Sequence, residues 1–366
     1  MNPRDPLQKV KYSVRCVDAY TLAARTAPVK LNQNENPYEL PESIKRGVIE
    51  RMQARPWSRY PDFDPHELIE GLAAFAGWKP EGILAGNGSN ELIQALFMVT
   101  VGPGTIVLVP EPSFTLYSIL TRILGGESMP ELLDDQFQYD PVELAETSVA
   151  VGATLTVVCS PNNPTGSVME PADVARLCQA APGLVVVDEA YHEFSGRSVV
   201  PLLAEHPNLV VLRTFSKAMS MAGLRVGYLL ADPALVREVN KARLPYNLNF
   251  VSQTAALLAL AEPAAVRRTV DTLVAARESL FLQLARIPGV KPYPSQANFI
   301  LFELENADPK AVFESVWKRG VLVRDVTGYP RLGRCLRVSV GSEEENTAFL
   351  AALRHALEEQ RFRKEE

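Results

Sequence analysis

Lys217 is the side chain of this sequence with the clearest capacity for covalent chemistry. It follows the apolar run at 209–212 and stands in the segment TFSKAMSMAGLR. This placement predicts a loop at the carboxyl end of a buried strand, where open α/β sheets bind their ligands. A lysine removed from water shifts toward its neutral form, which is nucleophilic and forms Schiff bases. The alternative is an ordinary solvated loop lysine, and the neighbouring motifs must decide between the two.

Asp188 is the second candidate, because the apolar run GLVVV leads directly into it. A buried carboxylate is costly unless a cation or a hydrogen-bond donor lies beside it. A protonated pyridine ring is one such partner, and pyridoxal-phosphate sites combine a lysine Schiff base with an acidic residue at the ring nitrogen. A helix cap or a structural ion pair at the end of the strand would explain Asp188 equally well.

Two turns beside expected strands add further polar groups. The motif SPNNPTG at 160–166 is rich in turn-forming residues, and its Asn163 offers a side-chain amide to a ring hydroxyl. A plain tight turn is the alternative there. The motif GNGSNE at 86–91 precedes the helical pattern LIQALFM, so its backbone N–H groups and the helix dipole would face a phosphate. Further hydroxyl and guanidinium groups for the same phosphate come from Thr214, Ser216 and Arg225.

The elements that must position these residues alternate along the middle of the chain. Short, continuous apolar runs are separated by helical patterns, which is typical of a mostly parallel sheet covered by helices. The expected strands are residues 105–109, 155–158, 184–187, 209–212 and 226–230.

Three helix starts carry capping signals. Asp64 and Asp232 each precede a proline, and Ser342 with Glu345 makes a capping box. A long helical pattern runs from about 254 to 287 and is broken or kinked at Pro263, and we expect it to bridge two domains.

The end of the chain predicts a smaller α+β domain. Its expected strands are 299–304, 321–326 and 335–340, and its expected helices are 308–319 and 343–359. The predicted division is an N-terminal arm at 1–38 associated with the small domain, a large domain at 39–262 and a small domain at 263–366.

Composition bounds the class of protein. Of 366 residues, 47% are hydrophobic and 22% are charged, and this composition excludes a disordered chain. The net charge of -6 argues against nucleic-acid binding. No apolar stretch is long enough to span a membrane, no signal peptide is evident, and the four cysteines are widely separated. We therefore expect a cytoplasmic protein without a metal centre that acts on small molecules.

Together these segments resemble the fold-type I pyridoxal-phosphate aminotransferases of class I/II over nearly the whole chain. Three motifs occur in the order and spacing of that family, namely SPNNPTG, VVVDEAY and TFSKAMSMAGLRVGY. The resemblance implies that Lys217 is the Schiff-base lysine, Asp188 the pyridinium partner, and Tyr191 with Asn163 the donors to the ring hydroxyl. Either Phe114 or Tyr117 would stack on the ring. The implied phosphate ligands are Gly88, Ser89, Asn90, Thr214, Ser216 and Arg225.

The ends of the chain are similar to histidinol-phosphate aminotransferases. The matching motifs are VKLNQNENPY, RYP, VRDVTGY and CLRVSVG. The resemblance implies that Arg337 and Arg324 bind anionic substrate groups, because the planar guanidinium matches carboxylate or phosphate. It also implies that Tyr60 reaches the cofactor phosphate of a neighbouring subunit. The residues expected to bound the imidazole end of the pocket are Tyr20, Asn34 and Tyr38.

Three features depart from the family pattern. Asn90 stands where aspartate is frequent, Met219 where phenylalanine is frequent, and Arg331 and Arg334 are additional. The extra positive charge beside the anion clamp would suit a different acidic or phosphorylated substrate.

The implied reaction is transamination of L-histidinol phosphate with 2-oxoglutarate to imidazole-acetol phosphate and L-glutamate, a step of histidine biosynthesis, carried out by a homodimer. An aromatic amino-acid aminotransferase and a pyridoxal-phosphate decarboxylase of a phosphorylated amino acid are the alternatives. A nicotinamide dehydrogenase is disfavoured by the missing G-x-G-x-x-G fingerprint. A non-catalytic α/β binding protein is the remaining class.

Overall fold

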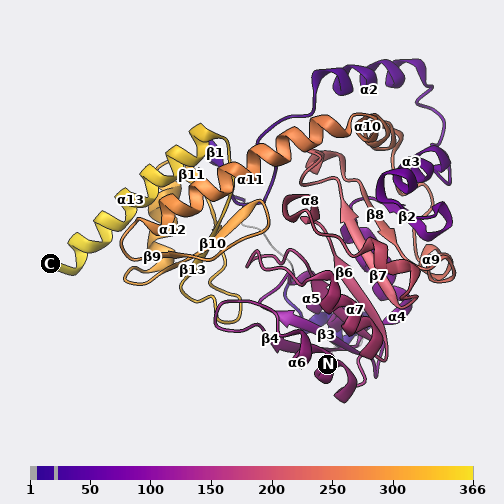
Figure 1. Cartoon of the computed structure of the whole chain (residues 1–366), viewed down its shortest axis with the longest axis horizontal. Helices are drawn as coiled ribbons and strands as arrows, with labels where there is room; N and C mark the ends of the chain where they lie inside the picture. Colours follow the sequence, from indigo (N-terminus) through magenta and orange to yellow (C-terminus); the bar gives the residue numbers. More distant parts are fainter. Residues whose placement is uncertain (1–5, 20–23, 366) are drawn as a thin grey trace.

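A seven-stranded sheet forms the larger part of the molecule (Figure 1). The structure is a computed structural model and describes residues 6–19 and 24–365. The strand order is β2-β8-β7-β6-β5-β3-β4. The strands β3 to β7 run parallel to one another, whereas β8 is antiparallel to both of its neighbours, β2 and β7. The strands are β2 (Ile83–Gly86), β3 (Ile106–Glu111), β4 (Glu127–Leu132), β5 (Leu155–Cys159), β6 (Leu184–Asp188), β7 (Leu209–Thr214) and β8 (Gly227–Leu230).

All five strands predicted for this sheet are present, and the sheet is mostly parallel as expected, with β8 as an antiparallel strand. A parallel pair needs a long crossover connection, whereas β7 and β8 are joined by a loop with one short turn of 3-10 helix, so the chain reverses. The sequence patterns also missed β2 and β4. The strand β4 lies at the sheet edge, is half-exposed and contains Pro130, so it lacks the continuous apolar pattern.

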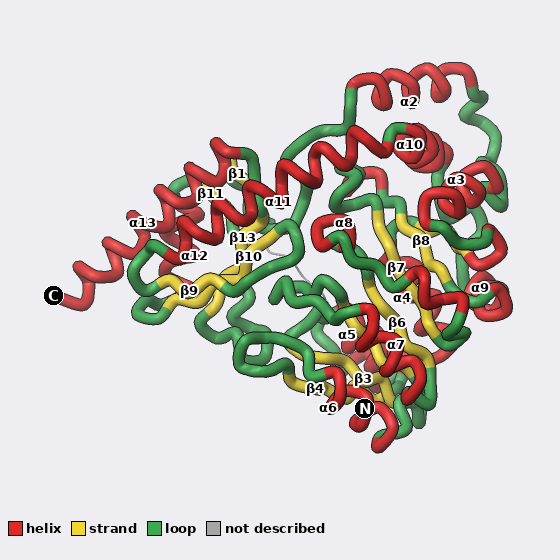
Figure 2. The backbone as a smooth tube through the Cα atoms, viewed as in Figure 1, coloured by secondary structure: helices red, strands yellow, loops and turns green. Residues whose placement is uncertain are grey.

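Helices cover both faces of the large sheet (Figure 2). In β6, Val185 and Val187 pack on one hydrophobic cluster and Val186 on the other, as the two-residue period of a strand requires. The first cluster includes residues of α2 (Glu42–Ala54), α3 (His66–Ala76), α6 (Pro141–Ala150), α7 (Pro171–Ala180) and α10 (Phe250–Ala261). The second includes residues of α4 (Ser89–Thr100), α5 (Leu116–Leu124) and α9 (Pro233–Asn240).

The smaller part is built on a four-stranded sheet of order β12-β13-β10-β9. Its elements are β9 (Val290–Pro292), β10 (Phe299–Leu304), β12 (Arg324–Asp325), β13 (Cys335–Ser339), α12 (Pro309–Lys318) and α13 (Glu343–Glu365). The long helix α11 (Pro263–Ala285) runs from the large part to the small part (Figure 1). The fold class is therefore confirmed, whereas the proposed boundaries at residues 38 and 262 remain predictions.

The single strand expected at 321–326 is wrong, because the chain divides there between two sheets. β11 (Val321–Leu322) pairs in parallel with β1 (Val29–Lys30), while β12 pairs with β13. The pairing of β1 with β11 fixes the N-terminal segment to the small part of the molecule. Two short helices, α1 (Tyr12–Arg15) and α8 (His192–Ser195), complete the α-helices of the described residues.

Most of the predicted helix ends are confirmed. The Asp232 side chain caps α9, Ser342 and Glu345 exchange the two hydrogen bonds of a capping box, and the chain breaks between α10 and α11 at Pro263. The cap predicted at Asp64 is wrong, since its carboxylate accepts a hydrogen bond from Arg243 instead. Within residues 6–19 and 24–365, no helix is long and apolar enough to cross a membrane, and no three His, Cys, Asp or Glu side chains gather as a metal site would require.

Candidate active site

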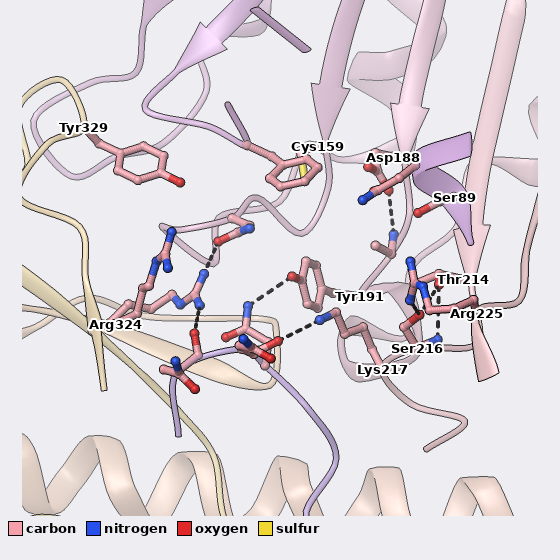
Figure 3. A pocket seen from close by; sticks show the side chains of 18 residues that line it. Ser89, Cys159, Asp188, Tyr191, Thr214, Ser216, Lys217, Arg225, Arg324 and Tyr329 are labelled. Atoms are coloured by element: carbon pink, nitrogen blue, oxygen red, sulfur yellow. Dashed lines mark hydrogen bonds between the residues drawn. The ribbon is translucent and has the colours of Figure 1, made fainter. Parts of the chain in front are cut away.

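A cavity of about 300 Å³ opens at the carboxyl ends of β5, β6 and β7 and is closed on its other side by the small part (Figure 3). Residues of the large sheet's loops lie at one end, and Arg324 and Tyr329 lie at the other. The predicted site residues that line it are Asn34, Ser89, Asn90, Phe114, Asn163, Asp188, Tyr191, Thr214, Ser216, Lys217, Arg225, Arg324 and Arg337.

Lys217 follows β7 and is half-buried in the cavity wall. Its Nζ donates a hydrogen bond to the carbonyl oxygen of Gln33 at 2.8 Å and lies 5.8 Å from the centre of the Tyr191 ring. Burial, and next the positive charge of Arg337, lower the pKa of Lys217 to about 7. A large fraction of this amine is therefore neutral near pH 7, which a nucleophile requires.

Asp188 ends β6 and is 3% exposed. Its Oδ1 accepts the backbone N–H of Ala190 at 3.1 Å, and its Oδ2 accepts the hydroxyl of Tyr117 at 2.6 Å. Burial raises the pKa of Asp188 to about 6. None of the ion pairs in the described part of the chain includes Asp188, so a structural ion pair does not explain it. A buried acid without a cation at a cavity wall suits a protonated ring nitrogen.

A phosphate-sized cradle lies where the turn at 86–91 enters α4. Gly88 has φ +78°, and a Cβ there would lie only 2.5 Å from Nη2 of Arg225. The Oγ of Ser216 accepts hydrogen bonds from Arg225 Nη1 at 2.9 Å and from the Thr214 hydroxyl at 3.0 Å. Hydroxyl groups, a guanidinium and the N-terminus of a 12-residue helix therefore converge. This donor set fits the phosphate of pyridoxal phosphate.

Phe114 and Tyr117, the two candidates for stacking on the ring, have different surroundings. Phe114 lines the cavity. Tyr117 does not line it; its side chain is completely buried and packs edge-on against Phe114, with ring centres 5.5 Å apart and an interplanar angle of 87°. Of the two side chains, only Phe114 is placed to contact a bound ring.

The small part contributes two arginines that are partners in the β12–β13 ladder. Arg324 lies opposite Arg337, so both side chains leave the sheet on the same face. Arg337 is 5% exposed and donates to Asn163 Oδ1 and, at 2.8 Å, to the carbonyl oxygen of Asn32. Two guanidinium groups side by side make this end of the cavity an anion site.

Tyr191 and Asn34 form the wall between the two ends. The Asn34 amide donates to the Tyr191 hydroxyl at 3.0 Å. Burial is the main cause that raises the pKa of this hydroxyl above its ordinary value, so it stays protonated and can donate to a bound ligand. Backbone carbonyls of Asn32 and Gln33 also contribute, and sequence patterns cannot reveal them because every residue carries one.

Tyr60 and Tyr38 are not among the side chains that line the cavity. Tyr60, expected to act at the cofactor of a neighbouring subunit, is 75% exposed and stacks on Tyr246 at 4.5 Å, and its expected role stays a prediction. Tyr38 packs in a hydrophobic cluster that includes Tyr191 but does not line the cavity. Tyr20 falls outside the residues that the structure describes.

The two additional arginines also point away from the cavity. Arg331 donates to the carbonyl oxygen of Leu133 at 2.5 Å and forms an ion pair with Asp135. Arg334 donates to the carbonyl oxygen of Leu304 at 2.5 Å. Neither lines the cavity, so the added charge expected beside the anion clamp is absent from it.

The comparisons with known proteins agree with this geometry. Residues 26–353 match the family "Aminotransferase class I and II". A histidinol-phosphate aminotransferase from Chlorobium luteolum is 38% identical over 93% of this chain and 96% of its own.

Two solved structures share the fold. That of histidinol-phosphate aminotransferase from Sinorhizobium meliloti, in complex with pyridoxal-5'-phosphate, has a TM-score of 0.89 at 24% identity and covers 96% of this chain and 98% of its own. L-threonine-O-3-phosphate decarboxylase from Porphyromonas gingivalis has a TM-score of 0.80 at 22% identity, with coverages of 90% and 99%. The fold alone therefore does not distinguish transamination from decarboxylation. The chain belongs to the class I and II aminotransferases, a pyridoxal-phosphate-dependent family.

Proposed function

We propose that this aminotransferase transfers the amino group of L-histidinol phosphate to 2-oxoglutarate, giving imidazole-acetol phosphate and L-glutamate. The observation that carries the proposal is the pairing of Arg324 with Arg337 at the cavity end opposite the phosphate cradle. Both substrates present an anion there, one a phosphate and the other a carboxylate. One pair of guanidinium groups can therefore accept each substrate in turn. The 38% identity to histidinol-phosphate aminotransferases supports the same substrate.

The chain divides the chemical tasks between few side chains. Pyridoxal phosphate, when bound, supplies an electron sink for the carbanion at the substrate Cα. Lys217 would hold the cofactor covalently, and its Nζ would be the group that removes and returns the proton at the substrate Cα. Asp188 would keep a positive charge on the ring nitrogen, and Asn163 and Tyr191, which line the same cavity, would orient the ring hydroxyl.

The proposed assembly is a cytoplasmic homodimer. Trp57, Tyr60 and Phe63 are large aromatic side chains that are each at least half exposed on one stretch of the chain. Exposed aromatic groups are enriched at interfaces between subunits. If a second copy of the chain packed on this stretch, Tyr60 would lie close to the cofactor phosphate of that second copy. Sedimentation of the active enzyme as a monomer would contradict this assembly.

A side-by-side assay of amino donors tests the substrate. Histidinol phosphate, phenylalanine, tyrosine and threonine phosphate are each offered with 2-oxoglutarate, and glutamate and carbon dioxide are measured. We expect the highest kcat/KM with histidinol phosphate and parallel double-reciprocal lines for the two substrates. A preference for phenylalanine or tyrosine would identify an aromatic aminotransferase instead. Release of carbon dioxide from threonine phosphate would identify a decarboxylase.

A further inference from the structure

Tyr117 makes a hydrogen bond that its position in the sequence does not suggest. It lies in the first turn of α5, its side chain is completely buried, and its hydroxyl is 2.6 Å from Oδ2 of Asp188. Its ring packs edge-on against Phe114, which lines the cavity, whereas Tyr117 does not line it. Tyr117 therefore contacts Asp188 from outside the cavity.

The two hydrogen bonds of Asp188 fix the direction of its carboxylate. The backbone N–H of Ala190 binds Oδ1, and Tyr117 binds Oδ2, so each oxygen is held from a different element. Neither donor is a cation, so neither neutralises the negative charge that a ring nitrogen would meet. A hydrogen bond to an ionised carboxylate favours its ionised form.

The electrostatics around this pair point in the same direction. Burial raises the pKa of Asp188 to about 6, and the Tyr117 hydrogen bond is the strongest influence that opposes this rise. Burial, followed by the charge of Asp188, also raises the pKa of the Tyr117 hydroxyl well above its ordinary value, so this group stays a donor. Tyr117 thus makes Asp188 a weaker base, and a proton shared with a ring nitrogen then resides more on the nitrogen.

We propose that Tyr117 is a positioning residue which, through its hydroxyl on Asp188 Oδ2, keeps this carboxylate ionised and aimed at the cofactor ring. The inference rests on the binding of pyridoxal phosphate in the cavity and is independent of which amino donor is used. Without the hydroxyl, Asp188 regains basicity and freedom to rotate. The ring nitrogen is then less protonated and the ring a poorer electron sink.

The test compares Tyr117→Phe with Tyr139→Phe, a matched control. Tyr139 is also a tyrosine of the protein interior, and its hydroxyl donates to the carbonyl oxygen of Cys159 at 2.5 Å. This hydroxyl makes no hydrogen bond to Asp188. Each protein is loaded with pyridoxal phosphate labelled with ¹⁵N in the ring, and the nitrogen resonance is recorded across pH. Thermal unfolding, kcat and KM are measured on the same samples.

We expect the nitrogen resonance of Tyr117→Phe to move toward that of an unprotonated pyridine, with kcat lowered about tenfold and KM changed little. Tyr139→Phe should keep the wild-type resonance even if it unfolds earlier. In an Asp188→Asn background, removal of the Tyr117 hydroxyl should move the resonance no further, because the two residues act as one unit.

Equal resonances for Tyr117→Phe, Tyr139→Phe and wild type would overturn the inference while leaving cofactor binding intact. A wild type that binds no pyridoxal phosphate would instead overturn the functional assignment on which it rests. Should Tyr117→Phe not fold, difluorotyrosine at position 117 keeps the shape and strengthens the donor. Its resonance should then move toward full protonation, and a shift in the opposite direction would contradict the proposal.

Discussion

The two ends of the cavity are built in different ways. At the cofactor end, the groups lie on short motifs that directly follow or precede strands of the large sheet, such as Asp188 after β6 and Lys217 after β7. At the substrate end, the wall brings together residues far apart in the chain, such as Asn32 and Arg337, which are 305 positions apart and share a hydrogen bond. The first end depends on local turns, and the second depends on how the small part docks.

This difference predicts that the two ends can be damaged separately. A substitution at the cofactor end should lower the activity with every amino donor by a similar factor. A substitution at the substrate end should change the preference among amino donors while leaving the cofactor bound.

Lys217→Ala should have the largest effect. It removes both the covalent anchor and the group that moves the Cα proton, so we expect kcat to fall about 10⁴-fold or more with every donor. Borohydride treatment of the loaded protein should trap no adduct, as followed by mass spectrometry. The exposed Lys241 provides a control, since Lys241→Ala should be trapped like wild type. A trapped adduct in Lys217→Ala would mean that another lysine is the anchor.

Arg324→Ala should separate the substrates. It leaves a bound anion poorly compensated, at a cost of about 2–5 kcal/mol in kcat/KM if the contact is desolvated. We expect a loss of orders of magnitude with histidinol phosphate, a smaller loss with phenylalanine and an unchanged visible spectrum of the cofactor. Arg331→Ala is the matched control, because it removes the same charge from a loop outside the cavity. Equal losses in the two variants would count against a local anion site.

Gly88→Ala should weaken the cofactor end only. The substitution places a Cβ at a backbone position with φ +78° and ψ 163°, which is almost exclusive to glycine, at a cost of about 1–3 kcal/mol, and against the Arg225 guanidinium. We expect the apoprotein to bind pyridoxal phosphate about tenfold more weakly, with the ratio of kcat/KM between donors unchanged. Gly223→Ala tests a nearby glycine that has open space around it and should bind normally. A changed donor ratio in Gly88→Ala would show that the ends are not separable.

The same difference explains what the sequence could predict. The apolar runs that end in Asp188 and lead to Lys217 are readable, because a buried parallel strand has a continuous pattern and its carboxyl end is a ligand site. The capping signals of Asp232 and Ser342 are equally local. Asp64 carries the same signal, but Arg243, distant in the chain, takes its carboxylate.

Tertiary contacts set the limit on prediction. Three features depend on which segments meet in space. They are the direction of β8, the division of residues 321–326 between two sheets, and the positions of the Arg331 and Arg334 side chains outside the cavity. No local pattern encodes them. The hydroxyl of Tyr117 is the clearest case, since its position beside Phe114 suggested a stacking ring and its actual partner lies 71 residues away.

The smallest predicted effect is the one that couples the two ends. Arg337 lies at the substrate end, yet it acts on Lys217. Burial of Lys217 is the largest cause that lowers the pKa of this amine to about 7, and the positive charge of Arg337 is the next largest. Only the neutral amine attacks the aldehyde of pyridoxal phosphate. The rate at which the apoprotein captures the cofactor should therefore rise with pH through about 7 rather than through the ordinary range of a lysine. Stopped-flow absorbance over a range of pH measures this midpoint.

Arg337→Gln removes the positive charge, so the pKa of Lys217 should rise and the midpoint of capture should move to higher pH by a fraction of a pH unit. Arg337→Lys keeps the charge and should stay close to wild type. Ionisations of the cofactor itself are common to all three proteins and cancel in the comparison. A midpoint that moves to lower pH in Arg337→Gln, or that shifts equally in Arg337→Lys, would mean that the guanidinium acts on Lys217 through packing rather than through its charge.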